Sequence, residues 1–414
     1  MTSIVGVLNK RAVAIAADSA VTMGNTHKVI NSANKIFTLS KYHPVAIMTY
    51  SNAVFMGVPW EIIIKEYRKQ LKEISFLYLK DYIDDFIKFL HGRQFFTDEQ
   101  TQKEFLVVLL DSFLNICRGE IYREKGISVD KQNENDLEEK LKQCLESNKK
   151  ADKCKEFETY SYEDFNTYSS KVLDTYLKKL KIKNTDLVRE SFFYYLSAKI
   201  ETLLYTGLVF VGYGENEIYP SLYPINITLA IDKHLRYYMD EKNVAQITEH
   251  GHGAVIIPFA QIDVTQTIIR GINPTFQDII YNVMKKSIKS FSGAITNILD
   301  ANPSTAVVSS AIKSLDLDKI IRDITVQINK QMRETYTDHL LNTVVSLDKE
   351  DMANMAESFI SLTSLVRRMQ PGEETVGGPV DVAVISKGDG FIWINRKHYF
   401  KPELNNAFIN NYFK

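Results

Sequence analysis

Short apolar runs separated by polar breaks open the chain, and their pattern predicts a group of β-strands over residues 2–50. The runs read SIVGVL, AVAIAADS, NKIFTLS and PVAIMTYS, and they are rich in Val and Ile. The breaks NKR, MGNTHK and KYH are polar and suit turns. Partial alternation in runs of this length is typical of strands that bury one or both faces.

Helical spacing of apolar residues replaces the strand pattern from Asn52 to about Tyr205. NAVFMGVPWEIIIKEYRKQL follows an Asn that can cap a helix, and TDEQTQKEFLVVLLDSFLNI begins with Thr97 followed by acids, which favours a helix start. The later stretch DKQNENDLEEKLKQCLESNKKADKCKEFE is densely charged. We expect a solvated helical hairpin or a mobile segment there.

Strand-like runs return after Tyr205, as GLVFVGYGENEIYPSLYPINITLAID, LRYYMD, NVAQITEH and GAVIIPFA. A second helical pattern extends from about Thr275 to Met369. The chain closes with PVDVAVISKGDGFIWINRK, which predicts two strands joined by a turn at Lys387–Gly390. The order β, α, β, α, β indicates one sheet system with helices on its outside. Two packed antiparallel sheets between helical layers would meet that requirement.

Composition and charge narrow the class of protein. The chain has 414 residues and 45% hydrophobic content, which is typical of a globular protein with one heavily inserted domain or two to three domains. Its 50 basic and 51 acidic residues balance, so no overall field draws it to nucleic acid or to an anionic membrane. Its apolar runs are too short to span a bilayer and do not read as a signal peptide.

The cysteines point to a reducing compartment. Cys117, Cys144 and Cys154 are an odd number and lack the spacing of metal ligands, which indicates free thiols. We therefore expect a soluble, cytoplasmic protein with no metal and no cofactor.

Thr2 stands directly before the first predicted strand. If Met1 is removed, Thr2 carries a hydroxyl and a free α-amine, which together make a nucleophile with its own base. A methionine aminopeptidase tolerates a small second residue, so we expect processing without a propeptide.

Asp18 ends the second predicted strand, and Lys35 begins the next one. Taken singly, each residue is ordinary at a strand edge, a turn or a solvated surface.

Together, these residues resemble the proteasome β-subunit family of N-terminal nucleophile hydrolases. The matching pieces read TSIVGV, AADS and NKIF, and TMGNT is similar to the bacterial member that works with an unfoldase ATPase. LVFVGYGENEIYPSLYPI and VGGPVDVAVISKGDGFIWI are similar to the family's middle and last strands. The resemblance extends over three blocks in the family's order.

The resemblance implies an α+β fold, a four-layer αββα sandwich with two helical insertions. The core strands would then come from residues 1–58, 205–300 and 371–414. Residues 59–204 would hold one helical insertion together with the first core helices, and residues 301–370 would hold the other.

The resemblance also implies chemical roles. Thr2 would be the nucleophile, and its amine would accept the hydroxyl proton. Lys35 would lower the pKa of both groups and stabilise the alkoxide, while Asp18 would hold Lys35 in place and keep it charged. The backbone N–H of Thr49, at a position where the family usually has glycine, would donate to the oxyanion.

Two positions depart from the family's pattern. His252, in EHGHGAV, stands where the family has serine, and either relays protons or is a loop histidine of a chain that has lost catalysis. Before the Gly-Gly pair, Glu373 keeps the family's carboxylate, whereas Val376 replaces a second serine.

The expected first specificity pocket, formed by Val21, Ala33 and Ile47, would suit an apolar side chain. The leading interpretation is a threonine-type peptidase or amidohydrolase that cleaves peptide or amide bonds within a homo-oligomer. The sequence leaves open whether a regulatory ATPase is a partner. A non-catalytic scaffold subunit and an amidase for a small metabolite are the alternatives.

Overall fold

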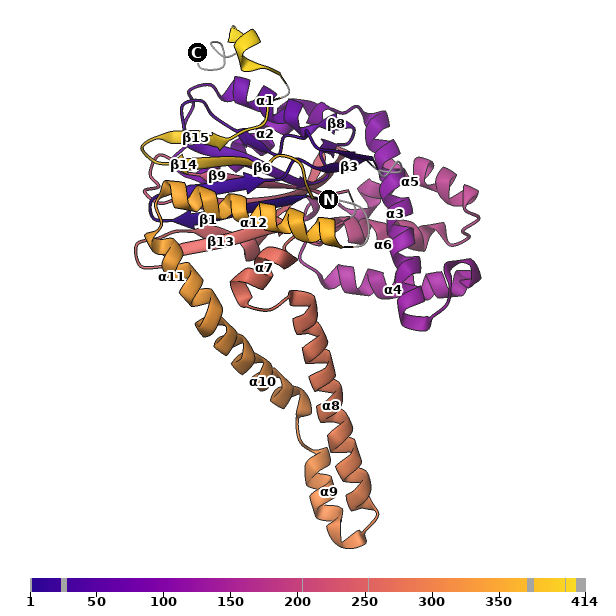
Figure 1. Cartoon of the computed structure of the whole chain (residues 1–414). Helices are drawn as coiled ribbons and strands as arrows, with labels where there is room; N and C mark the ends of the chain where they lie inside the picture. Colours follow the sequence, from indigo (N-terminus) through magenta and orange to yellow (C-terminus); the bar gives the residue numbers. More distant parts are fainter. Residues whose placement is uncertain are drawn as a thin grey trace.

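The computed structural model describes residues 2–23, 28–202, 204–251, 253–370, 376–398 and 400–406. Two antiparallel sheets lie at its centre (Figure 1). The first sheet has the strand order β13-β1-β2-β14-β15. Its strands are β1 (Ser3–Asn9), β2 (Val13–Ala17), β13 (Ala254–Ala260), β14 (Asp381–Ser386) and β15 (Gly390–Asn395). The first and last parts of the chain therefore meet in one sheet.

The second sheet has the order β11-β10-β9-β6-β5, and β12 pairs with β10. Its strands are β5 (Ile36–Thr38), β6 (Val45–Ser51), β9 (Thr206–Gly212), β10 (Ser221–Ile231), β11 (His234–Met239) and β12 (Ala245–Gln246). Two short hairpins stand apart: β3 (Val21–Met23) with β4 (Lys28–Ile30), and β7 (Val54–Phe55) with β8 (Val58–Pro59). The predicted strand runs between residues 2 and 50 are confirmed.

The two sheets share a hydrophobic core. Ile4 and Ile15 of the first sheet belong to the same buried cluster as Met48 and Val209 of the second. Gly6 in β1 allows this close packing, since a Cβ atom there would lie 2.8 Å from a methyl carbon of Leu222 in β10. The burial of this surface is the main force that holds the sheets together.

The second sheet also packs against the first group of helices. These are α1 (Trp60–Leu71), α2 (Leu79–Gly92), α3 (Glu99–Lys125), α4 (Glu134–Lys150), α5 (Tyr162–Lys179) and α6 (Thr185–Ser197). Phe210 and Leu229 of the sheet lie in one buried cluster with Trp60 and Phe86 of the helices. The densely charged stretch near residue 140 is ordered as α4, which buries Leu141.

The later helices lie on the other side of the molecule. They are α7 (Asp263–Arg270), α8 (Pro274–Asp300), α9 (Ala306–Lys313), α10 (Leu317–Met332), α11 (Asp338–Ser346) and α12 (Lys349–Met369). Phe359 and Ile360 of α12 pack on Val5 and Ala14 of the first sheet. By contrast, α8, α9 and α10 project away from the body (Figure 1). We call residues 274–332 the arm.

The architecture agrees with the expected α+β class, because helices combine with antiparallel sheets. In the described part of the chain, no helix is both long enough and apolar enough to cross a membrane.

Candidate active site

Asp18 follows the last residue of β2 and is buried. One carboxylate oxygen, Oδ1, accepts hydrogen bonds from the Ser3 backbone N–H at 2.9 Å and from Lys35 Nζ at 2.6 Å. The other oxygen, Oδ2, accepts from the backbone N–H groups of Ala20 at 3.1 Å and Gly377 at 3.2 Å. Four donors therefore surround this carboxylate, which suits a buried negative charge.

Lys35 lies just before β5, and its side chain is buried with Asp18. Its Nζ also donates to the carbonyl of Ala20 at 2.6 Å. Burial lowers the pKa of Lys35 from its ordinary value, and the nearby positive charge of Lys397 lowers it further. The negative charge of Asp18 opposes this shift, as does that of Asp381.

Thr2 lies one residue before β1 and is 5% exposed. Its carbonyl accepts a hydrogen bond from the Gln261 backbone N–H at 3.1 Å, just beyond the end of β13. The next residue, Ser3, shares the Asp18 Oδ1 atom with Lys35 Nζ. The structure thus brings Asp18 and Lys35 together beside the peptide group that joins Thr2 to Ser3.

The segment with the Gly-Gly pair, Gly377–Gly378, hydrogen-bonds to Asp18 and Ser19. Ser19 donates its backbone N–H to the Gly377 carbonyl at 3.0 Å and its hydroxyl to the Pro379 carbonyl at 2.5 Å. Val376, at the expected site of a family serine, is fully buried. The side chain that replaces the hydroxyl is therefore part of the packed interior.

A second buried ion pair was missed by reasoning from the sequence. Asp381, opposite Ala17 in the β14–β2 pair, bonds to Lys397 through both the side-chain Nζ and the backbone N–H. Both charges act on the pKa of Lys35. The acid at the start of DVAVIS was a usable signal, because a charge at the head of a buried strand needs a partner. Lys397 follows the last strand and carried no such signal.

Thr49 is placed differently from its expected role. Its backbone N–H donates to the Lys35 carbonyl at 2.8 Å, so this donor is already engaged. Successive N–H groups of a strand point to opposite sides. Asn52 donates toward β9, through Tyr205. Ser51 is the next residue of β6 in this alternation after Thr49, and it ends the strand with a φ of 68°.

The expected pocket residues do not form one set. Val21 and Ala33 are half-buried, and the Ala33 N–H donates to the Ser19 carbonyl at 3.1 Å. Ile47 is fully buried in the cluster that the second sheet forms with the helices, and it has no surface for a substrate. His252, Glu373 and Met1 lie outside the described residues.

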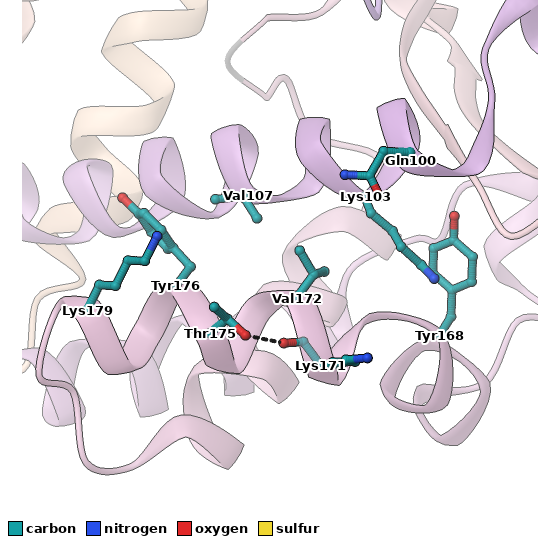
Figure 2. Close-up of a pocket in the computed structure, with 9 residues that line it drawn as sticks. All are labelled: Gln100, Lys103, Val107, Tyr168, Lys171, Val172, Thr175, Tyr176 and Lys179. Atoms are coloured by element: carbon teal, nitrogen blue, oxygen red, sulfur yellow. Dashed lines mark hydrogen bonds between the residues drawn. The ribbon is translucent and has the colours of Figure 1, made fainter.

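The structure has a separate groove between α3 and α5 (Figure 2). Its volume is about 430 Å³, and Lys103, Lys171 and Lys179 line it beside Tyr168 and Tyr176. Lys103 Nζ lies 4.8 Å from the centre of the Tyr168 ring. The residues that line this groove do not include the candidate catalytic residues. In the described part of the chain, no three His, Cys, Asp or Glu side chains are grouped so that they could hold a metal ion.

Comparisons with known proteins give a faint likeness. No family model matches the sequence, and no curated protein matches it. Two of the solved structures that align with the chain cover nearly its whole length. An Anbu (Gly-1) mutant from Hyphomicrobium sp. strain MC1 has 10% identity and a TM-score of 0.27, with 100% of this chain and 95% of that chain covered. Anbu (ancestral beta-subunit) from Yersinia bercovieri has 9% identity and a TM-score of 0.32, with 99% and 94% covered.

Proposed function

We propose that the chain is an N-terminal threonine hydrolase that cleaves peptide or amide bonds after Met1 is removed. One observation carries the proposal. Ser3 and Lys35 donate to the same oxygen of Asp18, which sets a buried ammonium group beside the residue that follows Thr2. The sequence resemblance to proteasome β-subunits assigns the same three residues, Thr2, Asp18 and Lys35, to catalysis.

The proposed architecture is the four-layer αββα sandwich of that family. It is supported by three separate buried clusters: one between the sheets, one between the second sheet and α1–α6, and one between the first sheet and α12. Each cluster joins one pair of neighbouring layers.

In the proposed reaction, Thr2 Oγ attacks the carbonyl carbon of the scissile bond. The hydroxyl proton passes to the α-amine of Thr2, directly or through water, as the C–O bond forms. The C–N bond then breaks, and the leaving amine takes that proton. Water attacks the resulting ester, with the α-amine again as base, and restores Thr2.

Lys35 supports this reaction through its charge. A buried ammonium group lowers the pKa of a neighbouring amine and hydroxyl, because it disfavours a second positive charge and favours the alkoxide. The negative charge of Asp18 favours the protonated form of Lys35, since it opposes the lowering of the pKa by burial. The pair therefore acts on Thr2 without itself exchanging a proton.

The oxyanion needs a donor that is not used elsewhere. We propose the Ser51 N–H in place of the Thr49 N–H, because Thr49 already donates to Lys35. We keep Val21 and Ala33 as the apolar lining of the first pocket. His252 as a proton relay and Glu373 as a support of the amine also stay proposals.

A non-catalytic scaffold is the second candidate, and two observations favour it. Thr2 is 5% exposed, and Val376 buries the position of a family serine. The state of Met1 separates the two functions, because a retained Met1 locks the amine in a peptide bond.

The test combines mass and turnover. Intact-mass measurement of the purified chain should show loss of Met1. Turnover of a set of fluorogenic peptide amides should disappear in Thr2→Ala and persist at a reduced rate in Thr2→Ser, which keeps a hydroxyl nucleophile. Equal circular dichroism spectra would show that both variants fold. Full activity in Thr2→Ala, or a retained Met1 in active protein, would contradict the proposal.

A further inference from the structure

Few side chains of the arm are buried. Helix α8 spans 27 residues, yet its buried residues are Gln277 and Thr296. Helices α9 and α10 each bury one residue, Ser309 and Ile321. Most helical stability in proteins comes from packing an apolar face against a neighbour. An arm with so few buried side chains needs a further surface to pack against.

One face of α8 already has a neighbour. Gln277 and Tyr281 both hydrogen-bond to Asn329 of α10, at 2.9 and 2.7 Å. Residues that continue this row at helical spacing, such as Ile288 and Ile295, are half-buried. This row marks the face of α8 that the rest of the arm covers.

A second row of apolar residues on α8 is uncovered. At about 100° per residue, it lies on a sector next to the covered row and away from Lys285 and Lys289. We call it the α8 stripe, and it consists of Phe276, Ile279, Ile280, Val283, Phe291 and Ile298. The exposed fractions of these side chains range from 38% for Ile280 to 72% for Ile298.

We infer that the α8 stripe is the contact surface for a second copy of this chain. This inference rests on the arm alone and does not depend on the proposed hydrolase activity.

The area of the stripe fits this occupant. An aromatic side chain can bury about 150–250 Å², and the two phenylalanines and four aliphatic side chains of the stripe are 38–72% exposed. Together they leave several hundred Å² uncovered, as much as the largest patch on a typical monomer. Val307 on α9 and Val326 on α10 are also exposed, by 82% and 65%. A stable complex buries roughly 800 Å² per partner, so the stripe alone supplies a large part of such an interface.

The chemistry of the stripe also fits a second copy. Its six named side chains are apolar, and Lys286 adds one positive charge at the border beside Ile279, so the stripe has an apolar centre with little charge to select a charged partner. A twofold pair of arms would place the same stripe on both sides and cover both at once. The arm projects from the body (Figure 1), which leaves α8 open to a second molecule.

The first test measures mass. Sedimentation velocity and light scattering over a range of concentrations should give wild-type assemblies of at least two 47.5 kDa chains. The double variant Val283→Glu with Phe291→Glu should halve that mass. Val108→Glu is the matched control, because Val108 is an apolar residue on α3 with 49% exposure and lies outside the arm. It should leave the mass unchanged.

The second test traps the contact. Ile280→Cys should give a disulfide-linked dimer under mild oxidation, whereas Lys285→Cys, on the charged side of α8, should not. A wild type that is monomeric at every concentration would overturn the inference, as would an unchanged mass of the double variant. So would a monomer that floats with phosphatidylcholine vesicles through the stripe, since that result would assign the stripe to a lipid surface.

Discussion

Lys35 Nζ lies 2.6 Å from Asp18 Oδ1, and the two side chains are 4% and 1% exposed. A buried ion pair of this kind contributes little net stability when intact, because desolvation offsets the attraction. Removal of one partner is costly, since it leaves the other charge buried and uncompensated. Substitution of Asp18 or of Lys35 alone should therefore destabilise the fold, apart from any effect on catalysis.

Asp18→Ala should lower the free energy of unfolding by about 3–5 kcal/mol, because Lys35 and the backbone N–H groups of Ser3, Ala20 and Gly377 lose their acceptor. Urea unfolding followed by circular dichroism measures this change. Glu66→Ala is the control, because it breaks the exposed Glu66–Lys69 pair and should have no measurable effect. Equal effects of the two substitutions would contradict the structural role of Asp18.

The stability of the protein should depend on the charge of Lys35 in alkaline solution. Its pKa in the folded chain is below the ordinary value of 10.5, mainly because of burial. Between these two values the unfolded chain binds more protons than the folded chain, so the free energy of unfolding rises with pH. Above 10.5 the lysine is neutral in both states, and the cost of burying its charge is gone.

This dependence can be measured as a difference. The stability of the wild type minus that of Lys35→Met should increase as the pH rises through the folded pKa toward 10.5. The other lysines are present in both proteins, so their contributions to the pH dependence cancel in the difference. A flat difference over this window would show that Lys35 keeps its ordinary pKa, and a falling one would show that its pKa is raised, so either result would contradict the prediction.

The sequence predicted much of this site but not its details. Apolar runs placed the strands around Asp18 and Lys35, and the family resemblance paired these residues. The hydrogen bond from the Thr49 N–H to the Lys35 carbonyl could not be predicted from the sequence. It depends on the register between β5 and β6, which is set by the whole sheet.

The packing of the later helices likewise could not be predicted from the sequence. Helical periodicity predicted a block of helices from about Thr275 to Met369, and the structure forms α8–α12 there. Periodicity marks an apolar face but does not identify what covers it. It could not show that α12 packs on the first sheet while α8 leaves the body.

Ser51 offers a test of the proposed oxyanion donor. Its φ of 68° lies in the left-handed region, which favours glycine. Ser51→Gly should therefore be more stable than Ser51→Ala by about 1 kcal/mol. The alanine variant also removes the hydroxyl that bonds to Tyr205, so it serves as the matched control for that loss.

Both Ser51 variants keep the backbone N–H, so both should keep peptide-amide turnover to within a few-fold. A large loss of turnover in Ser51→Ala would assign the effect to the hydroxyl group and not to the backbone donor. Thermal unfolding and initial rates on the same samples separate stability from activity.

Arg236 should be the strongest single link between the second sheet and the segment that follows α6. It is fully buried on β11. Its guanidinium donates to the carbonyls of Leu196 at 2.6 Å and of Ala198 and Ile200 at 2.8 Å, and to the Thr228 hydroxyl at 2.9 Å. These partners are neutral, and the guanidinium supplies donors to the Leu196 carbonyl in the last turn of α6 and to the Ala198 and Ile200 carbonyls that follow the helix.

Arg236→Met keeps much of the side-chain volume but removes the guanidinium donors of the Leu196 and Ile200 carbonyls, while the Ala198 carbonyl keeps the Ile200 N–H as a donor. The free energy of unfolding should fall by about 3 kcal/mol or more, since each unsatisfied buried group costs about 1–3 kcal/mol. Arg123→Met, at an exposed position on α3, is the control and should change stability little. Limited proteolysis should then cut the Arg236 variant first near residues 198–202. Resistance at that segment, together with a loss below about 1 kcal/mol, would show that water or other groups replace the guanidinium.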